Sequence, residues 1–231
     1  MRRTFVVLSV LALAFAAGCK KKPTRRDPPP NANVPAAPDL LLPKSDGTPP
    51  KKTTAALGKA DFERLAKLEY PGFVADVRTV GDKVFEVRHK TKDHPVLWAQ
   101  VTIQPCFDCL PMDLEKWKPR EEELRTINLE SLKDTPGVDW DLNTVKFHDQ
   151  AVIYWYQVGQ GMGSASEGGG GMGFTDAYIV YYNDGVNQIR VIASYKDDPT
   201  TTEELKKLAP KEDLEALALA FLDVYTHAWV Q

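Results

Sequence analysis

The sequence predicts an α+β protein: an α/β/α sandwich with a central, mostly antiparallel β-sheet and a C-terminal amphipathic helix, preceded by a disordered tether. Two patterns support the folded part. Short apolar segments from residue 73 onward alternate with polar residues at a period of two, which is typical of half-buried strands. Residues 211–230 instead carry Leu and aromatic side chains at helical spacing, which predicts a helix that packs on the sheet.

The first predicted elements form a helix, a hairpin and a strand. Residues 62–68 predict a short helix or turn, which Pro71 ends because proline cannot continue a helical hydrogen-bond ladder. Residues 73–80 and 84–89 predict a hairpin around Gly81-Asp82, and residues 96–103 alternate as a third strand.

The second half predicts one helical stretch, further strands and two terminal helices. Asp113 is placed to cap a helix, and Pro119 either kinks that helix or begins another. Asn183-Asp184-Gly185 predicts a hairpin turn, and Thr201 with Glu204 has the spacing of a capping box. The predicted strands and helices are 138–142, 145–147, 151–158, 177–182, 188–195, 201–209 and 211–230.

The N-terminus combines a positive start, a short apolar run and a cysteine. Arg2 and Arg3 precede apolar residues 4–17, which are too few to span a bilayer, and Ala-Gly-Cys19 follows. This segment resembles the bacterial lipoprotein signal, although Ala16 stands where that family favours Leu. The resemblance implies that residues 1–18 are a signal peptide and that Cys19 carries acyl chains such as palmitate. An ordinary secretory signal, a shifted cleavage point or an uncleaved anchor helix are the alternatives.

The resemblance also implies a location. The protein is expected in the cell envelope, attached to a membrane by its lipid and facing the periplasm or the cell surface. Lys20 follows the cysteine, and a residue other than Asp there implies sorting to the outer rather than the inner membrane. Two or more buried acyl chains give stable attachment, which a single chain does not.

Residues 19–58 predict the lipidated cysteine and a disordered Pro-rich tether, followed by one domain at residues 59–231. The tether holds nine prolines and few apolar residues, so burial cannot offset the entropy of ordering it. Its mainly apolar run, residues 39–43, is either a short docking motif or an accident of composition.

Charge is divided unevenly between the two parts. Residues 20–58 hold eight Lys or Arg against three Asp, and residues 59–231 hold 19 Lys or Arg against 29 Asp or Glu. An acidic domain argues against nucleic-acid binding, which depends on a basic surface. The basic tether either contacts anionic head groups or is a solvated linker.

The order of elements across residues 59–231 is similar to that of PsbP-like domains, which are α/β/α sandwiches. That resemblance rests on element order and on no diagnostic motif. It implies the sandwich fold and an accessory, assembly or binding role, without a particular activity.

Cys106-Phe107-Asp108-Cys109 is the sharpest local motif. In an oxidising compartment the two cysteines are expected to form a structural disulfide. One alternative is a redox-active pair, although Pro111 delays the following helix and the chain lacks the further units of a thioredoxin fold. The other is a metal site completed by histidines, although no histidine pair has zinc spacing.

A Gly-rich stretch and a group of aromatic residues supply a possible binding surface. Residues 159–173 hold eight glycines and predict a long hairpin loop, which either has no role or contacts a partner. Neither a phosphate loop nor a nucleophile elbow fits it. The strand aromatics either pack in the core or are exposed to a protein, peptide or glycan partner. The candidate surface residues are Tyr154, Tyr156, Tyr181, Met162 and Met172.

The preferred hypothesis is a non-enzymatic, lipid-anchored binding or assembly module of the envelope. The sequence offers no catalytic constellation, no metal site and no cofactor motif. The alternatives are an envelope thiol–disulfide oxidoreductase that uses Cys106 and Cys109, or a metal-binding envelope protein.

Overall fold

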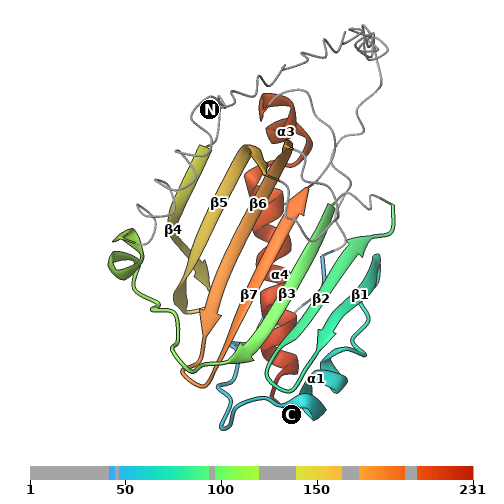
Figure 1. Cartoon of the computed structure of the whole chain (residues 1–231), viewed down its shortest axis with the longest axis vertical. Helices are drawn as coiled ribbons and strands as arrows, with labels where there is room; N and C mark the ends of the chain where they lie inside the picture. Colours follow the sequence, from blue (N-terminus) through green and yellow to red (C-terminus); the bar gives the residue numbers. More distant parts are fainter. Residues whose placement is uncertain are drawn as a thin grey trace, which may run out of the picture. The chain divides into compact units, whose positions relative to one another are not determined.

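The computed structural model describes residues 42–44, 47–93, 97–119, 139–162, 172–195 and 202–230. A helical run at residues 114–119 follows β3. The labelled elements, shown in Figure 1, are α1 (Lys59–Leu65), β1 (Phe73–Val80), β2 (Phe85–Thr91), β3 (Leu97–Pro105), β4 (Asp139–Phe147), β5 (Gln150–Met162), β6 (Met172–Asn183), β7 (Asn187–Tyr195), α3 (Thr202–Leu208) and α4 (Lys211–Ala228).

The seven strands form one sheet in the order β1-β2-β3-β7-β6-β5-β4, and every neighbouring pair is antiparallel. Hairpins join most neighbours, but β3 pairs with β7 across a long stretch of sequence. This pairing places β7 in the middle of the sheet, with β4 at one edge and β1 at the other (Figure 1). The predicted α+β class with an antiparallel sheet and a C-terminal amphipathic helix is confirmed.

One face of the sheet, called the helix face, is covered by α4 and α3. Helix α4 lies behind β3, β7 and β6 in Figure 1 and contacts all three. Alternation turns every second residue of each strand toward it, so the period of two in the sequence becomes one continuous core. Burying each large apolar side chain there contributes about 1.5–3 kcal/mol. From α4 the core takes Leu214, Leu217, Ala218, Phe221, Leu222 and Tyr225, which are all fully buried.

The opposite side of the sheet, turned to the viewer in Figure 1, is called the front face. The polypeptide that follows β3 lies on part of it, because Trp117 packs against Tyr181 with ring centroids 4.8 Å apart. Trp117 and Ile153 are buried in this layer. The sheet therefore carries cover on both faces.

Strands β5 and β6 are longer than the sequence predicted. They extend into the Gly-rich stretch until Met162 pairs with Met172. Antiparallel pairing gives each glycine its backbone hydrogen bonds, which compensates for the weak strand propensity of glycine. The predicted loop thus shrinks at both ends, and its centre, residues 163–171, lies outside the described residues.

Residues 47–57, called the strap, lie against the domain ahead of α1. Thr53 donates from both its amide and its hydroxyl to Asp184 Oδ2, over 2.7 and 2.5 Å. Asn187 donates to Ala55 O and accepts from the Leu57 amide. The sequence placed the domain boundary at residue 59, whereas this contact begins about a dozen residues earlier.

The apolar run that the sequence marked as a possible docking motif is described in part. Leu42 packs on the core and Pro43 is buried, so this part of the run docks on its own domain. The predicted signal peptide, Cys19 and residues 20–41 lie outside the described residues. In the part of the chain that is described, no helix has the length and apolar character to cross a membrane.

Candidate functional site

The front face places polar side chains of three strands side by side. The sheet register pairs Thr102 of β3 with Arg190 of β7, and Arg190 with Tyr181 of β6. Two residues along β7 from Arg190, on the same face, Gln188 lies between Gln104 of β3 and Asn183 of β6. Residues far apart in the sequence therefore form two short polar rows across the middle of the sheet.

The chain after β3 turns back over these rows. The Cys106 amide donates to Val186 O over 2.8 Å, and Asn183 Nδ2 donates to Leu110 O over the same distance. Asp113 caps the helical run at residues 114–119 through a bond from the Glu115 amide, as the sequence predicted. These contacts fix the segment containing Leu110 and Met112 above the sheet.

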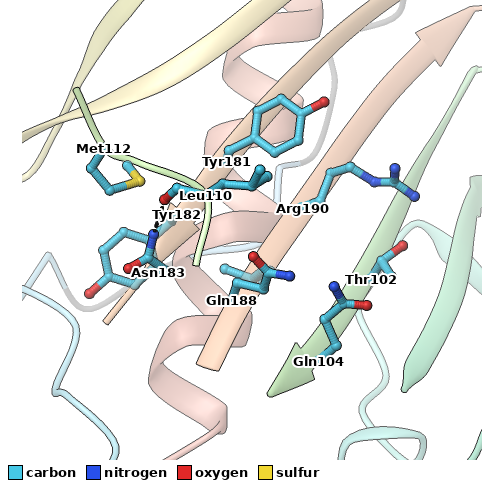
Figure 2. Close-up of a pocket in the computed structure, with 10 residues that line it drawn as sticks. Thr102, Gln104, Leu110, Met112, Tyr181, Tyr182, Asn183, Gln188 and Arg190 are labelled. Atoms are coloured by element: carbon cyan, nitrogen blue, oxygen red, sulfur yellow. Dashed lines mark hydrogen bonds between the residues drawn. The ribbon is translucent and has the colours of Figure 1, made fainter. Parts of the chain in front are cut away.

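A cavity of about 140 Å³ lies between this segment and the sheet (Figure 2). Strand residues supply its polar floor, while Leu110 and Met112 supply an apolar wall. Figure 2 shows Gln188 between Met112 and Leu110 on one side and Thr102 and Gln104 on the other. The full lining is Thr102, Gln104, Leu110, Met112, Tyr181, Tyr182, Asn183, Gln188, Ile189 and Arg190.

Three polar atoms of this lining are buried without a hydrogen-bond partner. They are Thr102 Oγ1, Gln188 Oε1 and Arg190 Nε. A buried polar group without a partner costs about 1–3 kcal/mol, so such groups are rare unless water or a ligand satisfies them. Their gathering in one cavity marks it as the best candidate binding site among the described residues.

Arg88 shows how an arginine on the same face is satisfied elsewhere. Its Nε and one terminal nitrogen donate to Gln100 Oε1, and its guanidinium lies 4.2 Å from the Trp98 ring centroid. Arg190 has no comparable partner in the described part of the chain, because its neighbours in register are Thr102 and Tyr181. The difference singles out Arg190 as a side chain placed for binding.

Two tyrosines of the expected binding surface are instead in the core. Tyr154 and Tyr156 are 7% and 6% exposed, because they point to the helix face under α4 and α3. Tyr154 donates to Asp141 Oδ2 over 2.6 Å and accepts from Lys211 Nζ over 2.9 Å, which ties the start of α4 to β4 and β5. This part of the expectation is wrong, since the hydroxyl has a structural role.

The remaining members of that expected surface are placed differently. Tyr181 is on the front face and lines the cavity. Met162 and Met172 pair at the far end of the β5–β6 hairpin, away from Tyr181 in register. Alternation does turn Trp155 to the face opposite Tyr154 and Tyr156, as the sequence predicted.

Cys106 and Cys109 form a disulfide in the structure, with a Cα–Cα separation of 4.8 Å. The described helical run that follows begins only at residue 114, so neither cysteine lies in its first turn, where a helix N-terminus would stabilise a thiolate. The bond closes the turn that leads into Leu110 and Met112. The disulfide therefore lies directly before the segment that forms the apolar wall, and neither cysteine lines the cavity.

The histidines lie in two separate places. His89 is buried on the helix face, where Nε2 is 2.8 Å from the Tyr225 hydroxyl, and burial lowers its pKa to about 4. His148 Nε2 and His227 Nδ1 lie 2.6 and 3.3 Å from Asp223 Oδ1, which joins the β4–β5 turn to α4. His94 is outside the described residues. Among those that are described, no three His, Cys, Asp or Glu side chains are grouped to hold a metal ion.

Sequence reasoning missed Thr102, Gln188 and Arg190. The polar positions of their strands were visible as the side facing away from the core. The β3–β7 pairing that unites them was not visible, because these strands are more than 80 residues apart.

Comparisons with known proteins do not assign this site. No protein-family model matches the chain, and no curated protein sequence matches it. The case for a function therefore rests on the geometry of the front face.

Proposed function

We propose that this chain is a lipid-anchored binding module of the bacterial cell envelope, and that its ligand occupies the front-face cavity. The observation that carries the proposal is the set of three buried, unpartnered polar atoms on Thr102, Gln188 and Arg190. A ligand that satisfies them recovers hydrogen bonds whose absence destabilises the empty protein.

The surroundings of the cavity favour binding. Its polar floor belongs to three strands at the centre of the sheet, whose backbones are held by hydrogen bonds on both sides. Side chains on such a scaffold are already in position, so little conformational entropy is lost when a ligand binds. The apolar wall and few polar groups are also typical of small-molecule sites.

A test that does not depend on ligand class uses a panel of small neutral, cationic and anionic organic compounds. Binding to the purified full chain is measured as a rise in melting temperature, since a ligand specific for the folded state stabilises it. Met112→Trp fills the cavity from its wall and is expected to abolish the rise for every hit.

The matched control is Val74→Trp, which adds the same ring system at an exposed position on β1. This variant should show the same rise in melting temperature with every compound that stabilises the wild type. If no compound raises the melting temperature, or if Met112→Trp leaves all hits unchanged, the cavity is not a binding site.

The anchor is the second part of the proposal. It is supported by Arg2 and Arg3, the short apolar run and the small residues before Cys19. We expect cells expressing the chain to incorporate labelled palmitate into it, and Cys19→Ser to lose the label while Cys106→Ser/Cys109→Ser keeps it. Recovery of the labelled protein in the outer-membrane fraction is expected from Lys20. A chain without label, released in soluble form, contradicts the anchor.

A further inference from the structure

We propose that the cavity recognises the carboxylate of an N-acylated apolar amino acid, the group presented by the free C-terminus of a peptide. This inference rests on the proposed binding function and names its ligand class. Its basis is the combination of one cation, one hydroxyl, one amide oxygen and one apolar wall around the same space.

Arg190 sets the charge of the ligand. It is the only charged side chain among the described lining residues, which include no Asp, Glu or Lys. None of the ion pairs in the described part of the chain involves it, and its Nε–H is buried without an acceptor. A guanidinium in that setting favours an anion, and its planar fork matches the two oxygens of a carboxylate.

Thr102 and Gln188 define what lies beside that carboxylate. The Thr102 hydroxyl pairs in register with Arg190 and can donate a second hydrogen bond to the same oxygens. Gln188 Oε1 is an acceptor and needs a donor from the ligand. An amide N–H is neutral and meets that need, whereas an ammonium group would bring a charge that no acidic lining residue balances.

Leu110 and Met112 define the third feature. They lie across the cavity from the strand side chains and offer carbon and sulfur to the ligand rather than hydrogen bonds (Figure 2). Methionine adapts to irregular apolar shapes, so this wall suits a short aliphatic side chain. A carboxylate, an amide N–H and an apolar side chain on one carbon are the features of a peptide's last residue.

The experiment titrates the full chain with N-acetylvaline, its uncharged partner N-acetylvalinamide, free valine, and Gly-Gly-Val with either a free or an amidated C-terminus. Binding is measured by isothermal titration calorimetry. We expect both acids with an acylated nitrogen to bind, and the two amides and free valine to bind at least about tenfold more weakly.

Variants locate the interaction. Arg190→Gln should weaken N-acetylvaline binding at least about tenfold, and Thr102→Val should weaken it less, because it removes an uncharged partner. The matched control is Arg88→Gln, which removes an arginine from the same face outside the cavity and should leave the affinity within about twofold. Far-ultraviolet circular dichroism checks that each variant is folded.

The outcomes separate this inference from the proposed function. Equal binding of acid and amide, or unchanged affinity in Arg190→Gln, overturns the carboxylate inference and leaves binding at the cavity intact. Binding of N-acetylvaline without Gly-Gly-Val supports the inference with a free acyl amino acid as the source. No binding of any of these compounds, with hits elsewhere in the broader panel, overturns only the ligand class. If neither the compound panel nor the titration detects binding, both proposals are overturned.

Discussion

Asp176, near the middle of β6, is a buried acid on the helix face. Burial raises its pKa from 3.8 to about 7, although the nearby Tyr156 hydroxyl and the charge of Lys206 act in the opposite direction. The folded protein therefore holds this proton up to about pH 7, whereas the unfolded chain releases it near pH 4. The contribution to stability is complete below pH 4 and is lost as the pH rises through 7.

Asp176→Asn should remove this dependence. At about 1.4 kcal/mol per pKa unit, the wild type is expected to lose up to about 4 kcal/mol between pH 4 and pH 7 that the variant does not lose. Urea unfolding across that range measures the difference. Asp82→Asn, at an exposed carboxyl in the β1–β2 turn, is the control and should follow the wild type. If the free energy of unfolding depends on pH in the same way in the wild type and in Asp176→Asn, Asp176 is not the source of the pH dependence.

His89 has the opposite effect on the pH profile. Its ring is stacked on Phe221 at 4.6 Å, and its lowered pKa of about 4 keeps it neutral in the folded protein where the unfolded chain is protonated. The stability that it contributes is present above pH 6.5 and is lost as the pH falls toward 4.

We therefore expect His89→Phe to be less sensitive to acid by about 3 kcal/mol over that interval. The variant leaves the buried Tyr225 hydroxyl without its partner, so it should be less stable at pH 7. His89→Phe/Tyr225→Phe removes both polar groups and should regain part of that loss. Urea midpoints at pH 4.5 and pH 7 test both statements. A ratio of the two midpoints that is the same in the wild type and in the variants argues against them.

At the scale of elements, the strap depends on one buried side chain. Asn187 bonds to Thr53, Ala55 and Leu57, so a single residue at the start of β7 holds three positions of the strap. Asn187→Ala should lower the free energy of unfolding by about 2–4 kcal/mol, because it leaves the buried Leu57 amide without a partner and removes the partly buried bonds to Ala55 and Thr53.

Hydrogen exchange distinguishes release of the strap from general destabilisation. In Asn187→Ala the amides of Thr53 and Leu57 should lose protection before those of β3 and β7 do. Asn143→Ala on the exposed side of β4 is the control, with an expected change within about 0.5 kcal/mol. Uniform loss of protection across strap and sheet means that Asn187 acts on the fold as a whole.

The Cys106–Cys109 turn is the second element that can be tested alone. Closing a loop of four residues is worth about 2 kcal/mol in the chain-entropy model, so Cys106→Ser/Cys109→Ser should lower the free energy of unfolding by about that amount. Reductant should shift the urea midpoint of the wild type similarly and leave the variant unaffected. A midpoint that does not respond to reductant or to the substitutions shows that the bond carries no stability.

Most elements could be predicted because their patterns are local. The period-two strands, the Asn183-Asp184-Gly185 turn and the helix at residues 211–228 each follow from neighbouring residues. The extension of β5 and β6 could not be predicted, because glycine has low strand propensity and only the partner strand makes up for it. Tyr154 was misplaced for a related reason: its buried bond to Lys211 joins residues 57 apart.

At the scale of the molecule, the two faces of one sheet have different tasks. The helix face is apolar and closed, and His89, Tyr178 and Tyr154 pair there with side chains of α4, although His89 Nδ1 and the Asp176 carboxyl oxygens have no hydrogen-bond partner among the described residues. The front face keeps Thr102, Gln188 and Arg190 at the centre of the sheet, a position that normally favours apolar side chains. The candidate site follows from the gathering of these three half-buried side chains around one cavity.

The strap also determines where tension would enter the domain. The predicted tether between Cys19 and the first contact with the domain at Leu42 is residues 20–41, for which full polyproline extension would give a reach of roughly 70 Å, less than that of a tether that ends at residue 58. If the proposed anchor holds the chain and the chain is pulled, the load first meets the contacts of Leu42, Thr48 and Lys51 with the domain, and then passes through Thr53 to Asp184. Asp184 directly follows Asn183, which lines the cavity. Under the proposed anchoring, mechanical stress that passes these contacts would reach the rim of the proposed binding site.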